Sequence, residues 1–134
     1  MLGVDSNVLL RFLTGDSTAQ HAEAASLIDR AEDGSLFLSI MVLVEVHWVL
    51  RRAFKRSKSE VLQALDELVD SRQFTIEERA RVMKAIGLAR TTKADFADAL
   101  IALGNESMGC KRTVTFDLDA LDIAQMMTVE EAIA

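Results

Sequence analysis

Short apolar runs alternate along the chain with longer segments in which apolar residues recur at helical spacing. The short runs predict strands at residues 2–4, 36–38, 74–76 and 113–116, with a weaker one at 126–128. The longer segments predict helices over about 8–13, 18–33, 40–54, 59–69, 77–89 and 94–107. Strands that alternate with helices require crossover connections. The expected fold class is therefore α/β, a three-layer α/β/α sandwich around a central parallel sheet of about four or five short strands.

Polar and glycine residues stand at most of the predicted helix boundaries. Residues 5–7 read Asp-Ser-Asn directly after the first strand, and Ser39 follows the second; all are good helix N-caps. Gly34 is expected to close the second helix as a C-terminal glycine. In the helix predicted over 77–89, acids fall in the first turn and bases later, as the helix dipole favours.

Composition limits the kind of protein this is. The chain has 134 residues, 50% of them hydrophobic and 27% charged, so one folded domain over residues 1–134 is expected. The longest apolar run, residues 40–44, is far shorter than a membrane span, and the first residues lack the basic segment of a signal peptide. Cys110 is the one cysteine, so no disulfide framework exists and a reducing, cytoplasmic setting is expected.

The charge balance is acidic, with 15 basic residues against 21 acidic ones and a net charge of −6. Such a balance argues against binding a polyphosphate by bulk electrostatics. A polyphosphate could still be bound by a local basic patch or through a bound cation.

A few acids stand apart from the polar helix faces that carry most of them. Asp5 and Asp117 each follow a predicted strand, and Glu45 interrupts an apolar helix. Asp95 and Asp98 lie three residues apart at the start of another mostly apolar helix. Each acid taken alone is better explained as a helix cap or an ion-pair partner. Because ligands bind at the carboxyl ends of the strands in an open parallel sheet, the set together favours one shared site.

Carboxylates held close together away from water raise one another's pKa or bind a cation. A site made only of oxygen ligands, without cysteine or a suitably placed histidine, suits Mg²⁺ or Mn²⁺. Such an ion polarises a phosphoryl oxygen and activates water, so the expected chemistry is hydrolysis of a phosphodiester or phosphomonoester. The sequence has no glycine-rich phosphate loop, no Ser-His-Asp order and no Cys-His pair to support a nucleophilic hydrolase.

The ordered set of these motifs resembles the PIN-domain ribonucleases and, within them, the VapC-type toxins of toxin–antitoxin pairs. The resemblance covers almost the whole chain, through residues 4–10 (VDSNVLL), Glu45, residues 95–102 (DFADALIA) and residues 115–117 (TFD). It implies a catalytic Mg²⁺ (or Mn²⁺) site formed by four acids, which are Asp5, Glu45, Asp98 and Asp117. It implies auxiliary roles for four further residues, which are Asp95, Asp119, Asn7 and Thr115.

The same resemblance implies metal-dependent endonucleolytic cleavage of RNA, a homodimer, and a cognate antitoxin protein that inhibits by covering the site. Two other functions stay open at this point. One is a metal-dependent phosphatase or DNA nuclease that uses the same acids. The other is a catalytically inactive protein-binding domain in which the acids only cap helices.

Five basic residues fall within residues 51–58, and four of them are candidates for RNA binding: Arg51, Arg52, Lys55 and Arg56. One interpretation is a basic strip that contacts RNA phosphates. The other is an exposed helix end whose charges complement the helix dipole. The segments 42–54 and 60–69 are expected to form a helical hairpin, and the resemblance implies that the antitoxin docks there.

Overall fold

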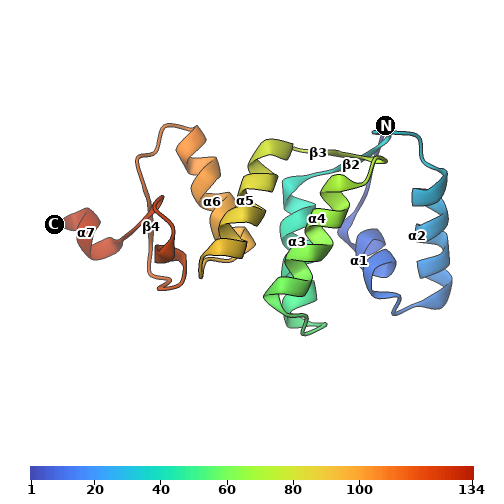
Figure 1. Ribbon diagram of the computed structural model, residues 1–134, viewed down its shortest axis with the longest axis horizontal. Coiled ribbons are helices and arrows are strands. Elements are labelled where there is room, and N and C mark those ends of the chain that lie inside the picture. The colour runs from blue at the N-terminus through green and yellow to red at the C-terminus, as the bar shows by residue number, and fades with distance from the viewer. The chain divides into compact units, whose positions relative to one another are not determined.

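The computed structural model describes every residue from Met1 to Ala134 (Figure 1). Two compact units make up the chain, Met1–Arg79 and Ala80–Ala134. In both units short strands alternate with helices, and every strand pair is parallel. The predicted α/β fold class with parallel strands is confirmed.

The first unit contains a three-stranded parallel sheet in the order β1-β2-β3, together with four helices. Leu2 of β1 pairs with Leu36 of β2, which in turn pairs with Phe74 of β3. Helix α1 packs against α2 and α3, and α3 packs against α4, so the predicted helical hairpin of the last two is present. The elements run in the order β1 (Leu2–Gly3), α1 (Ser6–Thr14), α2 (Thr18–Arg30), β2 (Leu36–Leu38), α3 (Ile40–Arg52), α4 (Lys58–Asp70) and β3 (Phe74–Ile76).

Buried side chains from the sheet and three of its helices form the core of this unit. The side chain of Leu38 in β2 is fully buried, as are those of Leu9 in α1, Leu43 in α3 and Leu65 in α4. This apolar packing fixes the helices on the sheet, and it thereby fixes the positions of the polar residues where strands give way to helices.

The second unit contains a two-stranded parallel sheet, β4-β5, in which Thr113 pairs with Met126. Its core includes Ala102 of α6, Ala120 of a short 3₁₀ turn and Ile123. Helix α5 starts at the boundary between the units. The elements are α5 (Arg79–Thr91), α6 (Phe96–Ser107), β4 (Thr113–Thr115), the 3₁₀ turn η1 (Ala120–Asp122), β5 (Met126–Thr128) and α7 (Val129–Ile133).

The predicted end of the second helix is wrong. Helix α2 stops at Arg30, and its C-cap Ala31 is extended rather than left-handed. Gly34 instead adopts a φ of +68° in the turn that leads into β2, where an added Cβ would lie 3.2 Å from the hydroxyl of Thr75. The last buried residue of α2 is Ile28, so a further helical turn would have had no apolar face to bury.

The start of the fifth helix also differs from the prediction. Glu77 and Glu78 precede α5, whose first turn contains no acid. Glu78 has a φ of +47°, and the carboxylate of Glu77 accepts a hydrogen bond of 2.8 Å from the backbone N–H of Ile40. Glu77 therefore satisfies a free N–H at the start of α3 instead of complementing the dipole of α5.

Helix α7 was not predicted from the sequence. Thr128 caps it in a capping box with Glu131, a signal that the sequence carries as Thr-x-x-Glu. None of the helices has the length and apolar character that crossing a bilayer requires.

Candidate metal centre

Two of the predicted acids, Asp5 and Glu45, are linked through one serine in the first unit. Asp5 is the N-cap of α1, and its Oδ1 accepts a hydrogen bond of 2.8 Å from the backbone N–H of Ser6. The hydroxyl of Ser6 donates a bond of 2.7 Å to Oε1 of Glu45 in α3. Ser6 is only 4% exposed, whereas both carboxylates are exposed. A single buried residue thus holds one acid through its backbone and the other through its side chain.

The local backbone explains why Asp5 lies at this point. Val4 extends the strand by donating a backbone bond of 3.0 Å to Phe37, and Asp5 keeps an extended conformation before the helix begins. The carboxylate therefore lies at the carboxyl end of β1 and at the positive end of the α1 dipole.

Glu45 differs from the sequence-based expectation in its surroundings. Its neighbours in sequence are apolar, but α3 buries Leu43 and Val46 on one side and exposes Glu45 on another. The carboxylate of Glu45 accepts the hydrogen bond from Ser6 on this exposed side of α3.

Three more of the predicted acids lie in the second unit. Asp95 is the N-cap of α6, and its Oδ1 accepts a hydrogen bond of 2.7 Å from the backbone N–H of Asp98. Asp98 returns a longer bond, with its Oδ2 3.5 Å from the backbone nitrogen of Asp95, which completes a capping box. Asp5 and Asp95 therefore both act as helix N-caps. This is the role that the sequence predicts for each of these acids when it is considered alone.

Asp117 follows β4 and is exposed. Its Oδ1 accepts two backbone hydrogen bonds, of 2.9 Å from Asp119 and 3.2 Å from Ala120, and so supports the 3₁₀ turn that follows. Its own backbone N–H donates to the hydroxyl of Thr115 at 3.0 Å. Thr115 thus acts on the backbone before Asp117, and Asp119 contributes a backbone N–H to its carboxylate. The side chain of Asp119 makes no capping bond.

The pKa of Asp98 is raised from 3.8 to about 6. Partial burial of the carboxyl is the largest cause, and the negative charges of Asp95 and Asp117 add to it. The three carboxyl groups of this unit therefore interact electrostatically. A bound cation would relieve the repulsion that now favours a proton.

The structure brings Asp5 together with Glu45, and Asp98 together with Asp95 and Asp117, each group inside its own unit. Within neither unit do three or more Asp, Glu, His or Cys side chains gather closely enough to hold a metal ion by themselves. The convergence of all four predicted ligands on one ion remains a prediction.

Asn7 does not support Asp5 by a hydrogen bond. It lies on the first turn of α1 and lines a pocket between α1 and α2. Ser6 supports Asp5 instead, and it is the one residue of this site to which the sequence-based interpretation gave no role beyond helix capping. Its signal was present in the Asp-Ser pair directly after the first strand.

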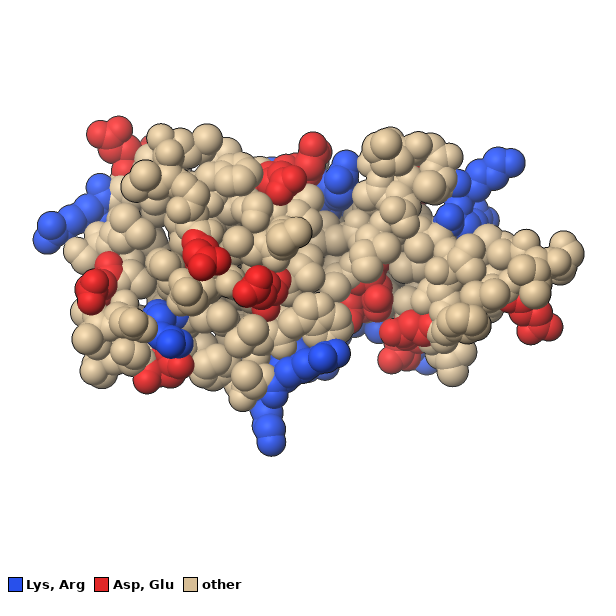
Figure 2. All heavy atoms as spheres, turned by 180° about the vertical axis from the view of Figure 1, so that it is seen from behind, with Lys and Arg blue, Asp and Glu red and all other residues tan.

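The predicted basic strip is only partly free to contact a ligand. A side-chain nitrogen of Arg51 donates to the backbone carbonyl of Arg56 at 2.9 Å, which holds the turn between α3 and α4. The guanidinium of Arg52 lies 4.4 Å from the ring centroid of Trp48, a cation–π contact. Lys55 is exposed in the same turn. On the face drawn in Figure 2, basic side chains form a small group at the lower edge, and acidic side chains lie elsewhere on the same face.

Comparison with known protein families matches residues 3–126 to the PIN domain. The chain belongs to the PIN domain family. The match spans nearly the whole sequence, and it agrees with the parallel α/β architecture and with the three-layer α/β/α arrangement expected for this family. No curated protein matches the chain.

PIN domains are generally metal-dependent nucleases, so this PIN domain is expected to act on nucleic acid. The candidate ligand atoms are of the kind that bind a hard cation. The acids of both units offer carboxylate oxygens, and the one cysteine, Cys110, is exposed elsewhere in the second unit. Oxygen ligands of this kind suit Mg²⁺ or Mn²⁺ better than zinc.

Proposed function

We propose that this PIN domain is an endoribonuclease that depends on Mg²⁺ or Mn²⁺ and acts as the toxin of a toxin–antitoxin pair. Four acids form its metal site: Asp5, Glu45, Asp98 and Asp117. In this proposal residues 1–134 act as one domain, and each unit contributes two of the ligands.

The observation that carries the proposal is the match to the PIN domain, and the interacting carboxyl groups of Asp95, Asp98 and Asp117 support it. A carboxyl group with a pKa of about 6, beside two further carboxylates, is poised to exchange a proton for a cation. Perturbed acids of this kind concentrate at functional sites. Capping accounts for Asp5 and Asp95, and Asp117 supports the 3₁₀ turn, but these roles do not require Asp117 to lie close enough to Asp98 to raise its pKa.

The residues of the chain have distinct tasks in this proposal. A divalent cation held by the four carboxylates would polarise a phosphoryl oxygen and lower the pKa of a water molecule. Ser6 keeps Asp5 and Glu45 oriented, since it bonds to both. The backbone N–H groups of the 3₁₀ turn hold one oxygen of Asp117 and leave the other oxygen for the ion. One of the carboxylates accepts the proton of the attacking water.

The test is cleavage of labelled single-stranded oligonucleotides by the full chain with Mg²⁺ or Mn²⁺, and with EDTA as the control. RNA is expected to be cut only when the metal is present, and Asp98→Asn is expected to abolish cutting. Glu106→Gln, an exposed acid on the same helix, is the matched control and should cut like the wild type. Cleavage of RNA by Asp98→Asn at the wild-type rate would refute the metal site.

The same assay separates the other functions. Cutting of DNA but not RNA, or release of phosphate from a monoester alone, would assign a different substrate to the same acids. A chain that cuts nothing and whose melting temperature does not respond to metal would be a protein-binding domain.

The proposed antitoxin and the proposed homodimer need surfaces on which to dock. The hairpin of α3 and α4 offers two exposed large apolar side chains, and both belong to α3: Met41 at 78% and Trp48 at 37% exposure. Light scattering on the purified chain tests the dimer. Toxicity on expression, relieved by co-expression of the protein encoded next to it, tests the antitoxin. Growth that is unaffected by expression would contradict the toxin role without affecting the nuclease assignment.

A further inference from the structure

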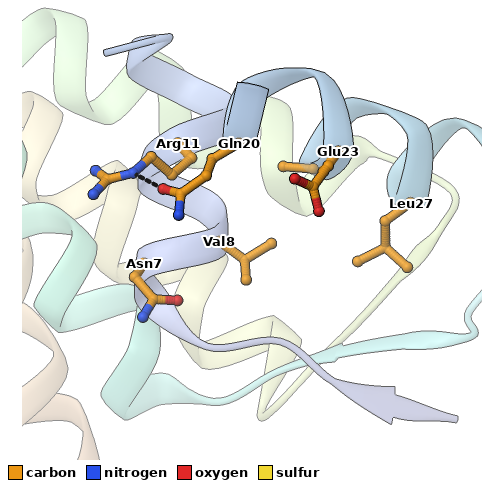
Figure 3. Close-up of a pocket in the computed structure, with 7 residues that line it drawn as sticks. Asn7, Val8, Arg11, Gln20, Glu23 and Leu27 are labelled. Carbon is orange, nitrogen blue, oxygen red and sulfur yellow. Dashed lines mark hydrogen bonds between the residues drawn. The ribbon is translucent and has the colours of Figure 1, made fainter. Parts of the chain in front are cut away.

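A pocket of about 470 Å³ lies between α1 and α2, apart from the acids of the proposed metal site. Its volume is within the range of about 300–1,000 Å³ that small-molecule sites occupy. Figure 3 shows the side chains that line it, which come from α1 (Asn7, Val8, Arg11) and from α2 (Gln20, Glu23, Ala24, Leu27).

The apolar part of the pocket comes from both helices. Val8 of α1 and Leu27 of α2 project into the space between the helices, as Figure 3 shows, and Ala24 is buried beneath it. An apolar surface of this kind packs against the face of a planar ring.

A hydrogen-bond donor of fixed orientation lies on the α2 side of the pocket. The Nε–H of Arg11 donates to the side-chain carbonyl oxygen of Gln20, and another nitrogen of Arg11 pairs with Asp16 at 3.0 Å. The carbonyl of Gln20 is therefore occupied, which leaves its amide nitrogen as the group that a ligand meets. Figure 3 shows that nitrogen directed away from Arg11 and toward the pocket.

A free acceptor lies next to this donor. Glu23 is three residues after Gln20, so the two side chains are neighbours on one face of α2, with Cβ atoms about 5–6 Å apart. The carboxylate of Glu23 extends into the space opposite Val8 (Figure 3), and the structure gives it no hydrogen bond or ion pair. Donor and acceptor thus stand side by side above an apolar surface.

We infer that this pocket binds a guanine base of single-stranded RNA and sets a sequence preference for cleavage. The inference rests on the proposed function for its substrate class. Guanine presents two adjacent donors, N1–H and the N2 amino group, followed by the O6 acceptor. The Glu23 carboxylate matches the two donors, and the amide nitrogen of Gln20 matches O6.

The other bases match this pair of side chains less well. Adenine and cytosine present one amino group next to a ring acceptor, and that acceptor would face the Glu23 carboxylate. Uracil presents a single N–H between two carbonyl oxygens, which the carboxylate repels. Gln20 and Glu23 are exposed in the free chain, so a mismatched base is disfavoured to the extent that it covers these two groups without pairing with them.

Asn7 lines one end of the pocket and follows Asp5, the N-cap of α1, by two residues. Because positions two apart on a helix do not face each other, Asn7 and Asp5 point to different faces at the start of α1. An RNA strand that reaches from the first acid of the proposed site to this pocket therefore has to pass around the start of α1. The polar pair at its centre also favours the edge of a base over the apolar side of a protein helix.

The experiment measures binding and cleavage separately on the full chain. The probes are two labelled 11-nucleotide RNAs, one of uridine only and one with a single central guanosine. Binding is measured by fluorescence anisotropy in EDTA, and cleavage is measured with Mn²⁺. We expect the wild type to bind and cut the guanosine RNA at least tenfold better than the uridine RNA.

Two variants test the assignment to this pocket. Glu23→Gln is expected to reduce the guanosine preference at least fivefold, because its amide cannot accept from both donors. Asp29→Asn removes an exposed acid of the same helix outside the pocket and should keep the full preference. Leu27→Trp fills the pocket and should also remove the preference. It provides a second test that does not depend on charge.

The outcomes separate this inference from the proposed function. Tighter binding of the guanosine RNA without any cleavage supports the pocket and refutes the nuclease. Cleavage of both RNAs at equal rates, or a preference that survives in Glu23→Gln and Leu27→Trp, overturns the guanine assignment and leaves the nuclease standing. Equal binding of both RNAs by the wild type would also overturn it and would leave the pocket to a protein partner.

Discussion

Replacing Asp98 by asparagine should stabilise the folded chain at neutral pH while it removes metal-dependent activity. The pKa of Asp98 is 3.8 ordinarily and about 6 in the folded chain, so the folded state binds this proton more tightly than the unfolded state does. The contribution to stability is therefore fully present below pH 4 and is lost as the pH rises through 6. Above that pH the ionised carboxyl opposes folding.

The size of the effect follows from the same values. The interval from 3.8 to about 6 corresponds to about 3 kcal/mol at 1.36 kcal/mol per pH unit. Asp98 is only partly buried, so solvent screening reduces this figure to about 1 kcal/mol. Asparagine keeps an acceptor oxygen for the backbone N–H of Asp95, so the capping box is retained.

The assay is urea denaturation in EDTA at pH 4 and pH 8, for the wild type and for Asp98→Asn. The free energies of unfolding should agree at pH 4, and the variant should be more stable by about 1 kcal/mol at pH 8. Adding Mn²⁺ should then stabilise the wild type and have much less effect on the variant. A variant that is no more stable at pH 8, or that gains as much from Mn²⁺ as the wild type, would refute the reasoning.

Three further substitutions test other parts of the structure. Ser6→Ala removes the hydroxyl that donates a hydrogen bond to Glu45, so the free energy of unfolding in urea should fall by about 1 kcal/mol. The variant should also lower kcat more than it raises KM, and unchanged kinetics would contradict the positioning role. Arg52→Ala should weaken RNA binding and make the slope of log K against log salt about one unit shallower if this residue contacts a phosphate, whereas an unchanged slope would leave it only its contact with Trp48. Gly34→Ala forces a side chain into a left-handed conformation and should lower the free energy of unfolding by about 1 kcal/mol or more; a neutral result would show that the turn adapts.

The elements that the sequence predicted well are those with a strong local signal. The strands at 36–38 and 74–76 are present at their predicted bounds. In both cases the polar residues on either side of a short apolar run mark where the strand begins and ends. Ser39 caps α3 through its side chain, as predicted. For α4 both Ser57 and Ser59 are candidate caps by residue type, and the structure has Ser57 in that role.

The boundaries that were missed depend on contacts between distant residues. Glu77 binds the backbone of Ile40, 37 residues away in sequence, so no local pattern could show that it would leave the first turn of α5. At position 34 a glycine leaves room for the hydroxyl of Thr75 in the neighbouring strand. The sequence-based prediction instead assigned Gly34 the more common role of a helix C-cap.

The positions of the candidate acids in the fold could be predicted from the sequence, but their hydrogen-bond partners could not. The places of Asp5 after β1 and of Asp117 after β4 follow from the end of each strand. The link from Ser6 to Glu45 spans 39 residues and depends on how α1 packs against α3. The two helices bring these side chains together, and the local sequence pattern does not show how the two helices pack.

Position 6 tolerates very few amino acids. Its side chain has almost no access to solvent, so a larger residue would displace the packed neighbours around it. It must also supply a donor short enough to reach Glu45 on α3, and alanine and glycine have no such donor. A homologue with a different residue at this position would therefore need a compensating change opposite it, and the Asp-Ser pair is a compact marker by which sequences with this arrangement can be recognised.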